Sequence, residues 1–387
     1  MDEHSIEIDS KYHIKIVDTL DEFRKLKSIW NDLVGNHKSY VPYLCHEWFE
    51  IWLKHFLKQD KLLVLLLYNK ENLAAIAPFL VKNEKFKGII KVKKIELIGN
   101  ITSPIRSFIV KTCDAKKRED DISAIFRFFS DKFRSWDIID LNSVYDEFLS
   151  INILRNILTN YGLPNTGFHC FNYYYINGIN YSGEDYLKKR SKKLRENLRR
   201  RKRNLEKKGK VEFNILKNPE DIDHCFSLHY KVRDKSWKSK DINAEFLKDF
   251  AKLAGTKKWL RFGFALFDGD PIASQIRIVC NNISYFVSTV YDASYNEYSP
   301  GSILISEMIK YLIDIDKVTE MDYLYGDERY KKEWLDQKGE RKGIYVFNRN
   351  YKGWLASFLM IKFLPIVKKI KGLKKIKIIL SKRFLGR

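Results

Sequence analysis

The sequence predicts a mixed α/β fold with mixed sheets, in which one order of elements is used twice. Strand-length apolar runs recur between segments of helical periodicity along the chain. Two strand–turn–strand segments, residues 65–75 and 264–274, align without gaps and carry an alanine at the same place after the turn. With 387 residues, 45% of them hydrophobic, the chain has the material for two cores of ordinary size.

The first half opens with an alternating strand, followed by two helices, of which the first begins at Thr19 or Asp21 and ends at Val34. Three strands follow, then a helix and a last strand. The expected ranges after that first helix are 46–56, 62–68, 73–81, 89–98, 123–133 and 138–141, and the opening strand is 13–17.

The second half repeats this order of strand, two helices, three strands, helix and strand. The expected ranges are 211–216, 219–237, 245–253, 262–267, 272–279, 283–291, 303–315 and 321–325. We therefore expect an internal duplication, with an N-terminal half at residues 1–175, a C-terminal half at 176–351 and a tail at 352–387.

The net charge of +22 is concentrated in two segments. Residues 187–210 hold 14 Lys/Arg and two Glu, residues 352–387 hold 11 Lys/Arg and no acid, and the rest holds 46 bases against 47 acids. A partner recognised by charge must meet these two segments. The first reads as a helix with one apolar stripe, and nucleic acid, anionic lipid or a phosphorylated substrate all fit it. The stripe is Leu187, Leu194, Leu198 and Leu205.

The tail, from Lys352 to Arg387, mixes an apolar block with repeated lysines, and Pro365 and Gly372 interrupt it. The block is too short to span a bilayer, but a cationic amphipathic segment can lie among the headgroups of an anionic leaflet. Residues 1–15 lack the layout of a signal peptide. We expect a cytoplasmic protein, peripheral at the inner face of the cytoplasmic membrane, that meets the anionic membrane surface through this tail.

Cysteine and histidine spacing gives no sign of a metal site. The five cysteines are far apart and odd in number, and the eight histidines form no i,i+4 pair on one helix. We expect reduced thiols and no metal.

The most informative stretch runs from Tyr291 to Trp334. It holds a Tyr-Asp pair at 291–292, Ser-Pro-Gly at 299–301 at the entrance to a helix, and Gly-Asp-Glu-Arg-Tyr-Lys at 326–331. The unpaired amides of a helix N-terminus form an anion site, and a glycine leaves room for a phosphate to approach the backbone.

Together with Asp322, these pieces resemble the C-terminal half of the BioF2-like or CelD-type acetyltransferases, a branch of the GNAT superfamily of N-acyltransferases related to the FemABX transferases. The resemblance covers residues 160–350 best. It implies a tandem GNAT-like fold and acyl-CoA, such as acetyl-CoA, as co-substrate. The donor-binding residues that it implies are Thr289, Tyr291, Ser299, Gly301 and Ser302. The first half has no glycine after Pro104, so we expect it to shape the acceptor pocket.

Acyl transfer to an amine needs a base and a group that stabilises the oxyanion. The crowded acids Asp322, Asp327 and Glu328 are candidate bases, because neighbouring carboxylates and burial raise a carboxyl pKa. Tyr330 could serve as an acid or orient the acceptor. The structural alternative is a helix start in which Asp327 caps, Glu328 lies in the first turn and Tyr330 packs.

Three further residues are candidate substrate contacts. Gln275 and Arg277 are polar residues in an apolar strand, where a solvent-facing orientation is the alternative, and Lys331 could hold an acidic substrate or neutralise the acids.

These observations predict an acyl-CoA N-acyltransferase that acts on an amine of a cell-envelope or polysaccharide precursor. Two alternatives stay open: a FemABX-like transferase that takes its donor group from aminoacyl-tRNA, and a non-catalytic membrane-associated scaffold of the same fold.

Overall fold

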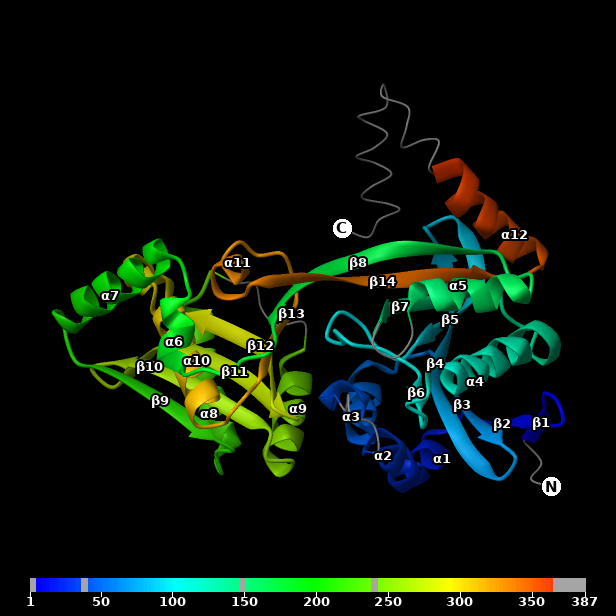
Figure 1. The fold of residues 1–387 in the computed structure, drawn as a ribbon, viewed down its shortest axis with the longest axis horizontal. Coiled ribbons are helices and arrows are strands. Elements are labelled where there is room, and N and C mark those ends of the chain that lie inside the picture. The colour runs from blue at the N-terminus through cyan, green and yellow to red at the C-terminus, as the bar shows by residue number, and fades with distance from the viewer. Residues whose placement is uncertain (1–4, 36–40, 146–149, 238–242, 365–387) are drawn as a thin grey trace. The chain divides into compact units, whose positions relative to one another are not determined.

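A computed structural model describes residues 5–35, 41–145, 150–237 and 243–364, and its contacts divide the chain into two compact units (Figure 1). Unit 1 comprises Met1–Cys170 and Arg341–Arg387, and unit 2 comprises Phe171–Glu340. The division expected from the sequence differs mainly in assigning residues 341–351 to the second half. One strand accounts for that difference, as described below.

The strands of unit 1 form a mainly antiparallel sheet with one exception among the described strand pairs. They are β1 (Ser5–Glu7), β2 (Tyr12–Val17), β3 (Lys61–Asn69), β4 (Asn72–Phe86), β5 (Ile90–Leu97), β6 (Ile109–Val110), β7 (Ile138–Val144), the start of β8 (Asn165–Ile176) and the end of β14 (Gln337–Phe347). Their order is β1-β2-β3-β4-β5-β7-β14-β8, with β6 paired to β4. The exception is β5 with β7, which are parallel and end their pairing at Glu96 opposite Asp140.

The helices of unit 1 are α1 (Leu20–Lys25), α2 (Lys27–Gly35), η1 (Pro42–Leu44), α3 (His46–Phe56), α4 (Ala115–Arg127), η2 (Phe128–Lys132), α5 (Ile151–Asn160), α12 (Tyr351–Ser357) and η4 (Phe358–Phe363). The helix expected from Thr19 to Val34 is interrupted at Leu26, although Thr19 does cap its start. Helices α4 and α5 share a core with the sheet, in which Phe126 and Leu154 lie with Leu65 of β3.

Unit 2 has the same design. Its strands are the rest of β8, β9 (Val211–Lys217), β10 (Leu260–Phe267), β11 (Asp270–Cys280), β12 (Ile283–Tyr291), β13 (Glu320–Tyr325) and the start of β14. Their order is β14-β8-β13-β12-β11-β10-β9, and β12 with β13 is the parallel pair (Figure 1). That pairing ends at Tyr285 opposite Asp322, which gives Asp322 the position in the register that Asp140 has in unit 1.

Helices cover both faces of the unit 2 sheet. They are α6 (Gly183–Lys188), α7 (Lys192–Glu206), α8 (Ile222–Asp234), α9 (Ala244–Thr256), η3 (Ala293–Tyr298), α10 (Pro300–Asp314) and α11 (Lys331–Trp334). Phe226 of α8 packs on Phe262 of β10. On the other face, Gly263 leaves room for Met308 of α10, whose methyl group would lie 2.5 Å from an added Cβ.

The duplication expected from the two hairpins is therefore a duplication of whole sheets, but the last strands are exchanged. β8 follows the elements of unit 1, yet its second part pairs with β13 in unit 2. β14 follows the elements of unit 2, yet its end pairs with β7 in unit 1, Ile344 opposite Leu141. Neither strand was expected from the sequence, and β14 is the reason why residues 341–347 belong to unit 1.

Of the predicted tail, the structure describes only residues 352–364, which form most of α12 and all of η4. The lysine-rich remainder, residues 365–387, lies outside the described residues. In the described part of the chain, no helix has both the length and the apolar character needed to cross a bilayer.

Candidate active site

The parallel strands of unit 2 separate at the position where the predicted donor residues begin. β12 and β13 are paired only as far as Tyr285 opposite Asp322, although both strands continue. β12 also bulges against β11, with Val287 as the extra residue. The edge of β12 that bears Thr289 and Tyr291 is therefore not occupied by β13.

The loop after β12 is shaped by local hydrogen bonds. Asp292 is buried and accepts hydrogen bonds from the amide and the hydroxyl of Ser294, at 3.0 and 2.6 Å, which starts the short helix η3. Ser299 then adopts a left-handed conformation, with φ 48°, and Pro300 is the first residue of α10. Proline suits this position because the missing N–H would have no helical acceptor.

The N-terminus of α10 brings four of the five predicted donor residues together. Gly301 lies on the ring of Tyr291, so close that an added Cβ would be 3.2 Å from Cδ1. The amides of Ser302 and Ile303 both donate to the carbonyl of Ser299, at 3.0 and 3.2 Å. No described residue accepts a hydrogen bond from the Gly301 amide, which adds to the partial positive charge of the helix end.

A cation from the basic helix α7 lies at the same place. The Arg201 guanidinium donates a hydrogen bond to the hydroxyl of Ser299. One residue on, Lys202 forms an ion pair of 2.9 Å with Glu307 of α10. The leucine stripe packs on the unit 2 cores, with Leu194 and Leu205 buried. The segment is not the single helix expected from the sequence, because α6 ends at Lys188 and α7 begins at Lys192. Helix α7 is thus held along α10 with Arg201 beside the unpaired amide.

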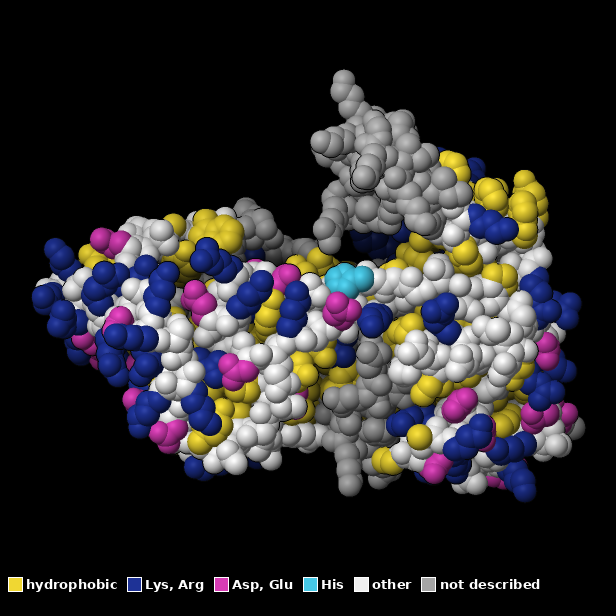
Figure 2. All heavy atoms as spheres, turned by 45° about the horizontal axis from the view of Figure 1, so that its top comes forward, with side chains coloured by type: hydrophobic (Ala, Val, Ile, Leu, Met, Phe, Trp, Pro, Cys, Tyr) yellow, Lys and Arg dark blue, Asp and Glu magenta, His cyan; other side chains and the backbone are white. Residues whose placement is uncertain are grey.

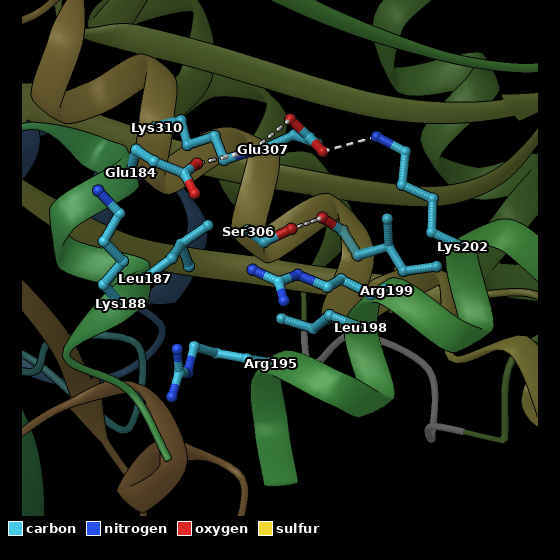
Figure 3. A pocket seen from close by; sticks show the side chains of 11 residues that line it. Glu184, Leu187, Lys188, Arg195, Leu198, Arg199, Lys202, Ser306, Glu307 and Lys310 are labelled. Carbon is cyan, nitrogen blue, oxygen red and sulfur yellow. Dashed lines mark hydrogen bonds and ion pairs between the residues drawn. The ribbon is translucent and has the colours of Figure 1, made fainter. Parts of the chain in front are cut away.

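A basic pocket of about 150 Å³ extends along the same side of α10 (Figure 3). Figure 3 shows Arg199 reaching from α7 into the pocket, and ion pairs joining Lys310 to Glu184 and Lys202 to Glu307. Its lining includes the cations Lys188, Arg195, Arg199, Lys202 and Lys310 and the acids Glu184 and Glu307. On α10 the pocket begins at Ile303, two residues beyond Gly301, and it includes none of the predicted site residues.

Gln275 and Arg277 are fully buried, so the solvent-facing alternative is wrong. The Arg277 guanidinium lies 4.2 Å from the ring centre of Phe286 and 4.5 Å from that of Tyr323, and donates to the Tyr323 hydroxyl at 2.9 Å. Its Nε donates to the side-chain oxygen of Gln275 at 3.2 Å. Among the described residues, Nη1 of Arg277 and Nε2 of Gln275 have no acceptor, and no carboxylate pairs with this guanidinium. Two fully buried donors close to the strand separation therefore lack a hydrogen-bond acceptor among the described residues.

The expectation of a raised carboxyl pKa is wrong for Asp327. Its side chain is exposed, and the Tyr174 hydroxyl donates to it at 2.5 Å. This hydrogen bond, with Lys338 at 3.3 Å and Lys332 at 3.7 Å, lowers the pKa of Asp327 to about 2. Burial and the Asp327 charge raise the pKa of Tyr174 to about 12. Asp327 is ionised at neutral pH and acts as a hydrogen-bond acceptor, not as a base poised near pH 7.

Of the two roles considered for Lys331, its contacts agree with neutralising an acid and not with holding a substrate. Its ammonium group donates to the carbonyls of Tyr323 and Tyr325, at 3.0 and 2.6 Å, and pairs with Glu328 at 3.0 Å. Burial lowers the pKa of Lys331, against the opposing effect of Glu328. Tyr330 packs against the α10 core, and burial with the Glu328 charge raises its pKa. Lys331 therefore holds the turn after β13 together.

Asp322 is buried, 5% exposed, and its carboxylate accepts a hydrogen bond from the Leu324 amide at 2.6 Å. It lies at the last residue pair of the parallel ladder, closer along the chain to the strand separation than Asp327 or Glu328.

The sequence analysis did not single out two residues that take part in these contacts. Arg201 is one of many cations on α7, and Tyr174 lies on β8, a strand that was not expected. Among the described residues, no group of three or more metal-binding side chains is close enough to hold an ion.

Comparisons with known proteins bear on the fold and on one domain of the chain. Residues 192–332 match the family model described as "Acetyltransferase (GNAT) domain". The chain therefore contains a GNAT domain in unit 2. It is related in fold to the FemABX transferases: the crystal structure of FemX aligns with a TM-score of 0.56 at 10% identity, covering 87% of this chain and 98% of that chain. A tandem GNAT protein from the clavulanic acid biosynthesis pathway aligns with a TM-score of 0.45 at 7% identity, over 86% of this chain and 98% of that one. A search of curated proteins gave no match.

The matched range contains the basic helix, the α10 N-terminus, the buried Arg277 cluster and the turn at Asp327. With the strand order described above, the chain has a tandem GNAT-like fold whose second unit carries the GNAT domain.

Proposed function

We propose that this protein is an acyltransferase that moves an acyl group from acyl-CoA to an amine of a cell-envelope or polysaccharide precursor. The observation that carries the proposal is the N-terminus of α10, where the unpaired amide of Gly301 and the guanidinium of Arg201 lie at the end of a buried helix. Backbone amides, a helix dipole and an arginine together favour a phosphate group.

The residues present fit acyl-CoA. Tyr291, Ser299, Gly301 and Ser302 surround the helix end, where Gly301 is itself buried and its missing Cβ leaves room for the ring of Tyr291. The cations of the basic pocket continue along α10 and suit the further phosphate of a nucleotide-bearing donor. When bound, acyl-CoA would supply the activated acyl group.

The reaction needs three events. The acceptor amine attacks the thioester carbonyl carbon, the C–S bond breaks with the electron pair going to sulfur, and a proton passes from the amine to a base while the thiolate is released. We assign the base to Asp322, because it is buried where β12 and β13 separate, and Asp327 is already ionised and occupied. Tyr330 keeps its proton at neutral pH and suits the role of a hydrogen-bond donor.

Arg277 and Gln275 would contact substrate through their unused donors. A buried guanidinium without a carboxylate is unfavourable until an oxygen acceptor approaches it. An acyl carbonyl oxygen that gains negative charge fits this need. Unit 1 would then shape the acceptor pocket, as expected from the sequence.

Membrane attachment is the second part of the proposal. The excess charge of residues 352–387 favours the inner face of an anionic cytoplasmic membrane, where envelope precursors are found.

Binding of the donor is the decisive test. Coenzyme A and acetyl-CoA should raise the thermal midpoint in a concentration-dependent way. The alternative, transfer from aminoacyl-tRNA, is favoured by the same basic pocket and predicts salt-sensitive binding of tRNA with no shift by CoA. If neither compound binds, the protein is a scaffold and the enzyme proposal fails. A matched pair of variants, Asp322→Asn and Asp327→Asn, then tests the base: only the first should abolish turnover while donor binding is kept.

A further inference from the structure

The helical segment α12–η4 is apolar on two opposite faces. Towards the sheet, Ala356 is buried and Leu355, Leu359 and Met360 pack on a core formed with β4, β5 and β14. The other face carries an exposed series, defined here as the aromatic ridge: Tyr351 is 75% exposed, Trp354 60%, Phe358 44% and Ile361 39%. These residues follow at spacings of three, four and three, and the rings of Trp354 and Phe358 are stacked with centres 5.9 Å apart. A surface helix normally exposes polar residues on this face, so the ridge calls for a second apolar partner.

A second exposed apolar residue lies at the tip of a hairpin that packs against the same helical segment, from a distant part of the sequence. The β4–β5 hairpin turns at Lys87 and Gly88, both with positive φ. At its tip Ile89 is 56% exposed, while Phe86 and Ile90 on either side are buried in the same core as Ala356. Both elements belong to unit 1 and lie side by side (Figure 1).

The polar residues around these two points are mainly cations. Lys352 and Lys362 are exposed on the helical segment, and Lys85 and Lys91 are exposed on the hairpin. The acid Glu84 is ion-paired with Lys94 at 2.9 Å. Figure 2 shows hydrophobic side chains with lysine and arginine among them at the end of the molecule where α12 lies. The chain then continues into residues 365–387, which contain nine Lys/Arg and no acid.

We infer that unit 1 docks on an anionic lipid bilayer through the aromatic ridge and the hairpin tip, with the ridge inserted among the headgroups. Aromatic side chains are favoured in the interfacial zone, and cations at their rim add attraction to anionic lipids. Exposed lysines on both elements complement an anionic bilayer and are the reason for choosing it over a protein partner. The inference rests on the membrane attachment proposed above and refines it, because binding to the bilayer depends on the ridge and not on the lysines alone.

The test compares binding to vesicles of phosphatidylglycerol and phosphatidylcholine in equal parts. The whole chain should cosediment with them, and Trp354→Ser/Phe358→Ser should bind about tenfold more weakly, since two aromatic rings no longer leave water. Ile89→Ser should weaken binding in the same direction. Ile315→Ser removes an equally exposed residue, 59%, at the end of α10 in unit 2 and should bind as the unchanged protein does. All replaced side chains are exposed, so the thermal midpoint should stay the same.

Insertion of the aromatic ridge into the bilayer can be measured separately by fluorescence quenching. Vesicles with brominated acyl chains should quench tryptophan fluorescence of the unchanged protein, and Trp354→Phe should remove most of that quenching while keeping vesicle binding. If the ridge variant binds as well as the unchanged chain, or if Trp354→Phe is quenched equally, the inference is wrong and the lysines alone attach the protein. If the unchanged chain does not bind, membrane attachment fails as a whole. Stabilisation by CoA, measured on the same samples, reports on the donor site independently.

Discussion

The sharpest test of the donor site is the removal of one cation from α7. Arg201 is the residue of the basic helix that contacts the N-terminus of α10, through the hydroxyl of Ser299. A charge-assisted hydrogen bond contributes about 1.5–3 kcal/mol. Arg201 is half-buried, so we take the lower end of this free-energy range. Arg201→Gln should then weaken CoA binding about tenfold.

The chain offers a matched control for this change. Arg203 lies on the same helix, in its last turn, but it is exposed, and no hydrogen bond or ion pair joins it to the described residues of α10. Arg203→Gln removes the same charge, and its effect on CoA binding should be about twofold or less at physiological ionic strength, where exposed charges are screened within about 8 Å. Isothermal titration with CoA, and with pantetheine as a ligand without phosphate, measures both variants.

Pantetheine separates the phosphate from the rest of the donor. Its affinity should be the same in Arg201→Gln as in the unchanged protein. Equal losses of CoA affinity in the two variants would mean that only the overall charge of α7 matters. An equal loss for pantetheine would mean that Arg201 supports the helix end and does not bind phosphate, and either result would refute the donor site as described.

Three further predictions concern single residues. Gly301→Glu should abolish CoA binding, because a carboxylate at this helix N-terminus repels a phosphate; retained CoA affinity in a titration would place the donor elsewhere. Tyr174→Phe should raise the pKa of Asp327 from about 2 towards its ordinary value, since the largest lowering contribution is lost, and NMR titration of the carboxyl carbon would show no change if Lys338 and Lys332 alone hold it down. In unit 1, burial raises the pKa of Asp140 to about 6. Because this pKa is higher in the folded than in the unfolded state, ionisation of Asp140 destabilises the folded protein at high pH and has no effect below the pKa of the unfolded state. Asp140→Asn should therefore gain thermal stability at pH 8 and none near pH 4. A gain in thermal stability that is independent of pH would contradict this explanation.

Much of the fold was predictable because its signals are local. The sequence placed the helix at 46–56 and the strand at 283–291 with the bounds that the structure has, since each has a clear apolar pattern and a turn at its ends. The α10 N-terminus followed from Ser-Pro-Gly, where each residue has a conformational reason for its place.

The features that were missed depend on residues far apart in the sequence. β8 is half-exposed over most of its length, and its partner β13 lies about 150 residues further on. The low pKa of Asp327 depends on Tyr174 of that strand. The packing of α7 on α10 decides which cation of α7 contacts Ser299. The number of cations in the sequence could not distinguish Arg201 from its neighbours.

The exchange of β8 and β14 has a practical consequence for anyone who divides this protein. Cutting the gene at residue 175 would leave β7 without the end of β14, its antiparallel neighbour, and would deprive β13 of β8 in the complementary fragment. Each piece would then present bare backbone donors and acceptors along a strand that is normally covered, a surface prone to association. Coexpression of the two fragments, rather than either alone, should therefore restore a well-behaved protein.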